Sequence, residues 1–98
     1  MNMQPLPLHL DDGETIPVRI STSENTTLIA CQEPRPFLEH ITKGQWSAAL
    51  TPDTYLRGRV LPNEGALFCL CDQFGMVADE IVRLTNEEAQ TLILDRLS

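Results

Sequence analysis

Residues 66–97 read ALFCLCDQFGMVADEIVRLTNEEAQTLILDRL, and this stretch decides the fold. Residues 66–71 are apolar throughout, a pattern typical of a central strand that is buried on both faces. Residues 72–75, Asp-Gln-Phe-Gly, have the composition of a type I turn, with Asp first and Gly last. Residues 76–84 then return as a second strand. The pattern therefore predicts a β-hairpin near residues 66–84.

A helix is expected directly after this hairpin. Thr85 and Glu88 have the spacing of a capping box, in which each side chain bonds the backbone amide of the other residue. Four apolar residues then recur at helical spacing and form one stripe: Ala89, Leu92, Ile93 and Leu97. We predict an amphipathic helix over about 86–97 that packs on one face of a sheet, because a helix this short is marginal in water by itself.

A second hairpin is predicted near residues 6–20. Leucines alternate with other residues before residue 11, and β-branched residues alternate after residue 15. Residues 11–14, Asp-Asp-Gly-Glu, supply the turn between the two runs. Pro7 and Pro17 cannot donate to a ladder, so we expect edge strands here, or strands in which these positions face outward.

Shorter signals fill the middle of the chain. Residues 27–31 and 55–61 are rich in strand formers, and the interior glycine of the second run indicates a bulge. A short helix is expected near residues 37–43, after Pro36, whereas residues 46–50 suit a strand or a helix equally. The sequence thus predicts an α+β fold with a mainly antiparallel sheet, formed by residues 1–98 as a single domain.

Charge and composition restrict the function. Fourteen acidic residues oppose seven basic ones, for a net charge of −7. This sign disfavours direct binding to nucleic acid and to anionic membranes, and it favours solubility or a basic protein partner. The N-terminus lacks the basic and apolar regions of a secretory signal, and no apolar run has the length of a membrane span. We expect a cytoplasmic protein.

The three cysteines leave two interpretations. An odd number cannot form a closed disulfide framework, which favours a reducing compartment. The main interpretation treats the cysteines as small apolar core residues, with no metal and no cofactor. The alternative is a zinc-stabilised module with four potential ligands: Cys31, His40, Cys69 and Cys71. Cys69 and Cys71 lie two apart in a predicted strand, so their side chains are expected on one face.

Catalytic signals are weak. The chain contains no glycine-rich phosphate loop, no nucleophile elbow and no metalloprotease motif. His9 is expected to face solvent in an edge strand, and His40 lies in a segment expected to be exposed, so neither is matched to a nucleophile. No catalytic residue is predicted, although a small enzyme or a ligand-binding domain stays open as a further alternative.

Surface residues give the predicted partner contacts. Acidic residues cluster in the first turn and interrupt the second strand of the C-terminal hairpin, as edges and bulges often do. Phe74 lies at a hairpin tip, where a core residue is unexpected, and Arg35 lies between two prolines on a segment expected to be stiff and extended. The predicted contacts are Arg35, Phe74, Asp79, Glu80, Asp11, Asp12 and Glu14.

These observations favour a small acidic non-enzymatic protein that binds another protein. Its size and charge are typical of adaptor, immunity and inhibitor proteins, including those of phages and other mobile elements. An acidic face is also able to imitate a phosphate track and occupy a basic nucleic-acid-binding groove on the partner. Exposed strand edges leave a homodimer open.

Overall fold

The computed structural model describes residues 3–45, 53–72, 74 and 77–97, and of residues 77–81 it describes the backbone alone. Six strands form one antiparallel sheet in which each strand pairs with its neighbours in the sequence. The strands are β1 (Gln4–His9), β2 (Thr15–Ser23), β3 (Thr26–Cys31), β4 (Tyr55–Leu61), β5 (Gly65–Cys71) and β6 (Val77–Leu84). The predicted hairpins near 6–20 and 66–84 are confirmed as β1–β2 and β5–β6.

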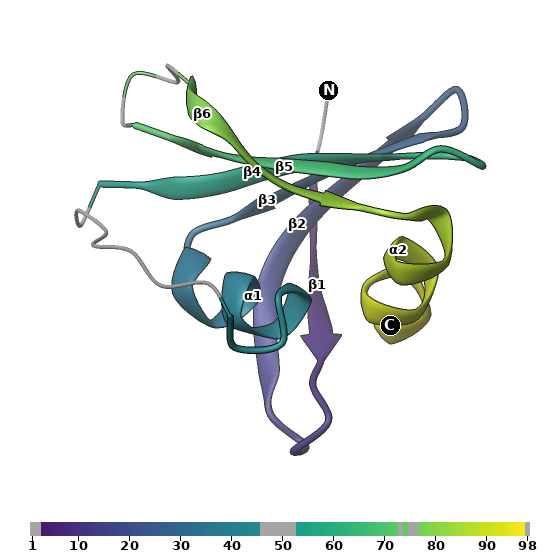
Figure 1. Cartoon of the computed structure of the whole chain (residues 1–98), viewed down its shortest axis with the longest axis horizontal. Coiled ribbons are helices and arrows are strands. Elements are labelled where there is room, and N and C mark those ends of the chain that lie inside the picture. The colour runs from purple at the N-terminus through teal and green to yellow at the C-terminus, as the bar shows by residue number, and fades with distance from the viewer. Residues whose placement is uncertain (1–2, 46–52, 73, 75–76, 98) are drawn as a thin grey trace.

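Both helices cover the same side of the sheet (Figure 1). α1 (Pro34–Ile41) connects β3 to β4, and α2 (Asn86–Leu92) follows β6 and leads into a short 3-10 helix, η1 (Leu94–Arg96). The expected α+β class, with a C-terminal helix packed against β5 and β6, is confirmed. No helix in the described part of the chain is long and apolar enough to cross a membrane.

The core lies between the helices and the sheet face that they cover. Alternate residues of each strand point to this face, where they meet the apolar stripe of α1 and the inward residues of α2. Phe37 of α1 and Phe68 of β5 are fully buried, and their ring centroids are 5.2 Å apart. The other buried members of the core are Leu8, Ile16, Val18, Ile20, Ile29, Cys31, Leu38, Ile41, Leu56, Val60, Ala66, Leu84, Ala89 and Ile93.

The prolines of the first hairpin face each other across the ladder. Pro7 pairs with Pro17, and since neither has an N–H, the pair fits the non-hydrogen-bonded type of antiparallel position. β1 is an edge strand, as expected. β2 is not an edge strand, because β3 lies on its other side. The pairing of β2 with β3 begins only at Arg19, so Pro17 lies where β2 has β1 as its one neighbour. Pro7 and Pro17 are both exposed, which matches the other alternative, that these positions face outward.

α1 begins earlier than predicted. The predicted short helix near 37–43 is confirmed as α1, which includes both prolines at its start and ends at Ile41. Proline suits the first turn of a helix, where an amide has no intrahelical partner to lose. Arg35 is therefore helical rather than extended.

α2 ends five residues before the predicted boundary at residue 97. Its start is as predicted: Thr85 Oγ1 accepts from the Glu88 amide at 3.1 Å, and the Glu88 carboxylate accepts from the Thr85 amide at 2.9 Å. These bonds hold the pKa of Glu88 below its usual range, the backbone bond most strongly. After Leu92 the chain continues as η1, and Leu97 is then extended and forms an antiparallel bridge with Leu8.

The helices cover one face of β5, and the other face is only partly buried, so the prediction of a strand buried on both faces is wrong. Phe68 points to the helices and is fully buried, whereas Leu67 and Cys69 on the other face are half-buried. The acidic pair at residues 79–80 lies in the edge strand β6, where the register with β5 shifts on both sides of Cys69. This outcome matches the expected edge or bulge.

Gly58 marks a close contact rather than the predicted bulge. The register of β4 runs without interruption past Gly58 on both sides. A Cβ atom at this position would lie 2.2 Å from Cδ1 of Phe68, the residue directly opposite. Glycine is therefore needed because the Phe68 ring lies over the backbone of β4.

Candidate functional site

An acidic hollow of about 610 Å³ lies between the β1–β2 turn and α1. The turn positions some of its carboxylates, and the segment before α1 and α1 itself supply the others. Its lining residues are Leu10, Asp11, Asp12, Glu14, Thr15, Ile16, Glu33, Pro36, Glu39 and His40. The structure thus brings the predicted cluster of Asp11, Asp12 and Glu14 together with Glu33 and Glu39, which were not predicted as contacts.

The acidic hollow has a charged rim and an apolar floor. Its five carboxylate residues are exposed, whereas Ile16 is buried and Leu10 is half-buried. The Asp12 carboxylate accepts from the Glu14 amide at 2.9 Å, which fixes the turn. Asp11 forms an ion pair with Arg96 at 2.8 Å. This arrangement suits a ligand with cationic groups around an apolar side chain.

The four potential zinc ligands do not converge. Cys31 lies in the core on the face covered by the helices, and its thiol donates to the Glu33 carbonyl at 3.3 Å. Cys69 and Cys71 share the other face of the sheet, as predicted. Their register partners on β4 are Arg57 and Tyr55, respectively. In the described residues, no group of three or more histidine, cysteine and acidic side chains is placed to hold a metal ion.

Two of these four residues, His40 and Cys31, make contacts that give them a structural role. Nε2 of His40 lies 2.7 Å from the Leu92 carbonyl, so the ring connects α1 to the end of α2. Burial raises the pKa of the Cys31 thiol to about 11, which keeps it protonated at neutral pH. A protonated thiol is a poor nucleophile, so this geometry does not favour a catalytic Cys31.

The face of the sheet opposite the helices carries a second charged surface. Strand register places two rows of residues across it, and the first row ends at Glu80 of β6, the partner of Cys69. The other members are Arg19, Ala30, Arg57 and Cys69 in that row, and Leu28, Arg59, Leu67 and Arg83 in the second row. We call these eight residues the arginine face. It holds four of the six arginines in the chain. The sequence analysis missed it because it requires the register of five strands.

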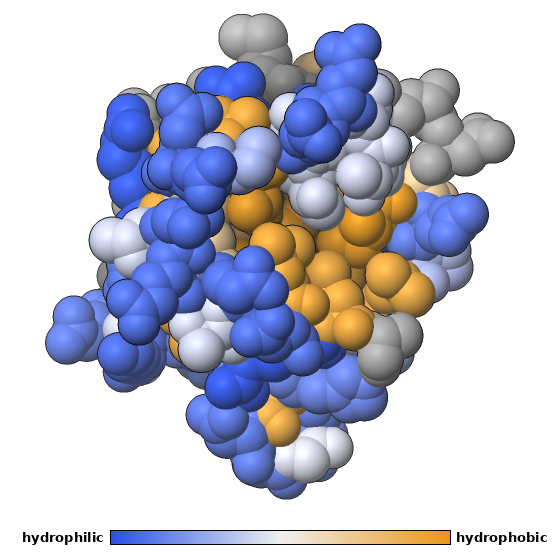
Figure 2. All heavy atoms as spheres, turned by 90° about the vertical axis from the view of Figure 1, so that its right-hand side faces the viewer, coloured by the Kyte–Doolittle hydropathy of each residue, from blue (hydrophilic) through white to orange (hydrophobic). Residues whose placement is uncertain are grey.

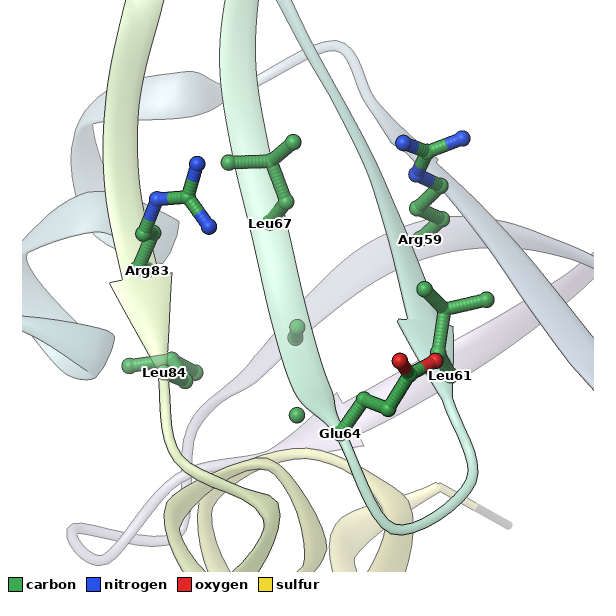
Figure 3. A pocket seen from close by; sticks show the side chains of 8 residues that line it. Arg59, Leu61, Glu64, Leu67, Arg83 and Leu84 are labelled. Atoms are coloured by element: carbon green, nitrogen blue, oxygen red, sulfur yellow. The ribbon is translucent and has the colours of Figure 1, made fainter.

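Apolar hollows separate the guanidinium groups. One, of about 280 Å³, lies between Arg57 and Arg59 and is lined by Leu28, Leu67 and the two cysteines of β5. Figure 3 shows a second, of about 340 Å³, where Arg59 and Arg83 extend on either side of Leu67. Glu64 lies at the turn that closes its end.

The pKa of the Cys69 thiol responds to its neighbours on the arginine face. Burial and its neighbour Cys71 raise the pKa of the Cys69 thiol, whereas the guanidinium groups of Arg57 and Arg59 act in the opposite direction. Burial is the largest cause. Cys69 is half-buried and the other two cysteines are buried, so it is the accessible thiol among the three.

Of the remaining predicted contacts, Phe74 and Arg35 belong to neither surface, whereas Glu80 is the register partner of Cys69. Phe74 follows β5 and is 80% exposed, the one large apolar residue of the described surface with such exposure. Arg35 is exposed in the first turn of α1. Asp79 and Glu80 lie in β6, and their side chains are outside the described part. Residues 46–50, which suit a strand or a helix equally, lie outside the described residues.

Replacing Phe74 by alanine is expected to change the free energy of unfolding by less than about 0.5 kcal/mol, because an exposed ring contributes little burial. Denaturant unfolding followed by circular dichroism measures this. A loss of about 2 kcal/mol or more would mean that the ring packs against the core.

Apolar side chains also gather on the side of the molecule that carries α2 (Figure 2). The C-terminal segment contributes half-buried leucines on this side: Leu92, Leu94 and Leu97. These leucines pack against the core. The patch is therefore the outer margin of the core.

No family model matches the chain, and no curated protein or solved structure is significantly similar to it. Its function is therefore inferred from the geometry of the described residues.

Proposed function

We propose that this chain is a non-enzymatic binding protein that recognises a basic segment of another protein through the acidic hollow. The observation that carries the proposal is the combination of a concave shape, an apolar floor and a rim of five carboxylates. An apolar centre with a polar rim is the usual anatomy of a protein interface. Carboxylates attract and orient Arg and Lys side chains, and the hollow has room for several residues.

The adaptor, immunity and inhibitor roles all fit this proposal. One target that suits an acidic rim is a basic nucleic-acid-binding groove on the partner, because such a groove already accommodates a row of phosphates. A reducing compartment such as the cytoplasm is part of the proposal, and the three free cysteines support it.

A pair of synthetic peptides tests the proposal. One peptide has the repeat Arg-Leu-Arg, and the other has Arg-Ser-Arg with the same length and charge. We expect the leucine peptide to bind more tightly, because only leucine fills the apolar floor, and we expect added salt to weaken both complexes. Isothermal titration calorimetry measures the affinities, and amide chemical shifts locate the peptide.

The matched variants differ only in where charge is removed. In the first, Asp12→Asn, Glu14→Gln and Glu39→Gln neutralise the rim, and Asp11 is kept because it pairs with Arg96. In the second, Glu24→Gln, Asp53→Asn and Glu64→Gln remove the same charge from exposed positions outside the hollow. The rim variant should lose about tenfold or more in affinity, and the second should keep most of it. Equal losses, or equal binding of the two peptides, would contradict a site in the hollow.

A further inference from the structure

Cys69 and Cys71 form a pair of thiols on the outer face of β5. Residues two apart in a strand point to the same face, and both cysteines line the hollow of about 280 Å³. The two thiols are hydrogen-bond partners, so their sulfur atoms lie close together. Cys69 is half-buried and open to the hollow, whereas Cys71 is buried. The outer face of β5 therefore presents one accessible sulfur with a second sulfur beside it.

The strand backbone disfavours a disulfide between these two cysteines. A β-strand rises about 3.3 Å per residue, so the Cβ atoms of residues two apart on one face are separated by about 6.6 Å. A disulfide requires its Cβ atoms to lie about 3.5–4.5 Å apart. Oxidation of the pair would require this end of β5 to leave its ladder with β4, in which both cysteines are paired. The two sulfurs are available instead to an atom that bridges them.

A metal ion with two sulfur ligands is such an atom. Two metal–sulfur bonds of about 2.3 Å each hold the sulfurs up to about 4.6 Å apart, more than twice the length of an S–S bond. Thiolates select soft ions such as Cu(I) and zinc. Structural zinc takes four ligands, and in the described part of the chain no third histidine, cysteine or acidic side chain is placed to complete a site. Cu(I) is stable with two thiolates in a linear arrangement, so the pair fits Cu(I).

Two arginines offset the charge of such a complex. Each thiolate brings one negative charge and the ion one positive charge, so the complex is an anion. Arg57 and Arg59 line the same hollow, and Arg57 is the register partner of Cys69 on β4. Glu80 is the partner of Cys69 on β6, so two basic residues and one acidic residue flank this sulfur. The balance is positive and stabilises an anionic centre.

We propose that Cys69 and Cys71 bind one Cu(I) ion between their sulfur atoms, with Arg57 and Arg59 stabilising the complex. On binding, each thiol loses one proton to the solvent, two copper–sulfur bonds form, and no electron is transferred. The ion enters from the hollow at Cys69, the accessible sulfur. The site lies on the opposite side of the sheet from α1 and the acidic hollow, so the inference is independent of the proposed function.

The test uses the full chain and Cu(I) alone, kept reduced in the absence of oxygen. Titration in competition with the coloured chelator bathocuproine disulfonate measures the stoichiometry and the affinity. Cys69→Ser and Cys71→Ser each remove one ligand. Cys31→Ala is the matched control, because it removes the thiol on the face covered by the helices. Circular dichroism shows whether each variant is folded.

The wild type is expected to bind one Cu(I) per chain. Each serine variant should lose about 100-fold or more in affinity, because even a change behind the ligands costs about 10- to 100-fold. Cys31→Ala should bind as the wild type does. X-ray absorption of the loaded wild type should show two sulfur ligands, a readout that does not depend on any variant.

The arginines have their own comparison. Arg57→Gln and Arg59→Gln should each weaken Cu(I) binding about two- to fivefold, the effect of one exposed charge pair. Lys43→Gln removes the same charge from an exposed residue after α1 and should have no effect. Arginine variants that bind as tightly as the wild type would contradict the role of this charge.

Three results would overturn the proposed copper site. The first is a folded serine variant with the affinity of the wild type. The second is one ion per two chains, with dimers in sedimentation, because the ion would then connect two copies. The third is Zn²⁺ binding as tight as Cu(I) binding, because two sulfur ligands do not complete a zinc site.

Discussion

Phe68→Ala is expected to lower the free energy of unfolding by about 3–5 kcal/mol, the range for removing a buried aromatic ring. Phe68 is fully buried in the middle of β5, and its ring contacts that of Phe37. The flat backbone of Gly58 lies beneath it and offers no side chain that could move into the space. Chemical denaturation of the purified variant measures the loss.

A second substitution, at Gly58, shows whether the loss of stability in Phe68→Ala arises at the contact between these two residues. Gly58→Ala alone is expected to destabilise the protein by about 1–3 kcal/mol, because its Cβ collides with the Phe68 ring. Combined with Phe68→Ala, the new methyl group occupies vacated space, so the two losses should not add. Additive losses would mean that the two residues do not contact each other in solution.

Gly65→Ala is expected to cost about 2–4 kcal/mol. Gly65 has φ +105°, which residues with a side chain rarely adopt, and a Cβ atom there would lie 2.1 Å from the carbonyl oxygen of Leu84. That oxygen belongs to the backbone of β6, so a rotamer change cannot relieve the conflict. Thermal and denaturant unfolding both report this loss.

Two other glycines serve as controls that measure the cost of a positive φ without a steric collision. Gly13 and Gly44 also have positive φ, but a Cβ atom at either meets nothing within 4 Å. Alanine at these positions is expected to cost only about 1–2 kcal/mol, the conformational penalty alone. A loss of stability in Gly65→Ala no larger than in these controls would contradict the close approach of the Leu84 carbonyl oxygen to Gly65.

The sequence predicted the elements better than their ends. Capping at Thr85 and the alternation around residues 11–14 are local signals, so the start of α2 and the first hairpin were predicted correctly. The apolar stripe runs on to Leu97 without marking the end of α2 at Leu92, and no local pattern reveals the bridge between Leu97 and Leu8. The sequence also did not reveal that the outer face of β5 is only partly buried, because an apolar run does not show how many layers cover a strand.

The two candidate surfaces also differ in how far a local sequence pattern predicts them. Asp11, Asp12 and Glu14 are adjacent in sequence, so their cluster was predicted directly. Glu33 and Glu39 join them only because α1 packs beside the first turn. The arginines are spread from residue 19 to residue 83, and only the register gathers four of them on one face. Whether any of these residues contacts a partner stays a prediction.

The attachment of the two chain ends has a consequence for folding kinetics. Each strand pairs with the next one along the chain, so most of the sheet needs only short loop closures and has a low contact order. The C-terminal segment is an exception: Arg96 bonds the His9 carbonyl across 87 residues and pairs with Asp11, and Leu97 bridges to Leu8. We expect this long-range closure to form last during folding, and to open first when the native state unfolds locally.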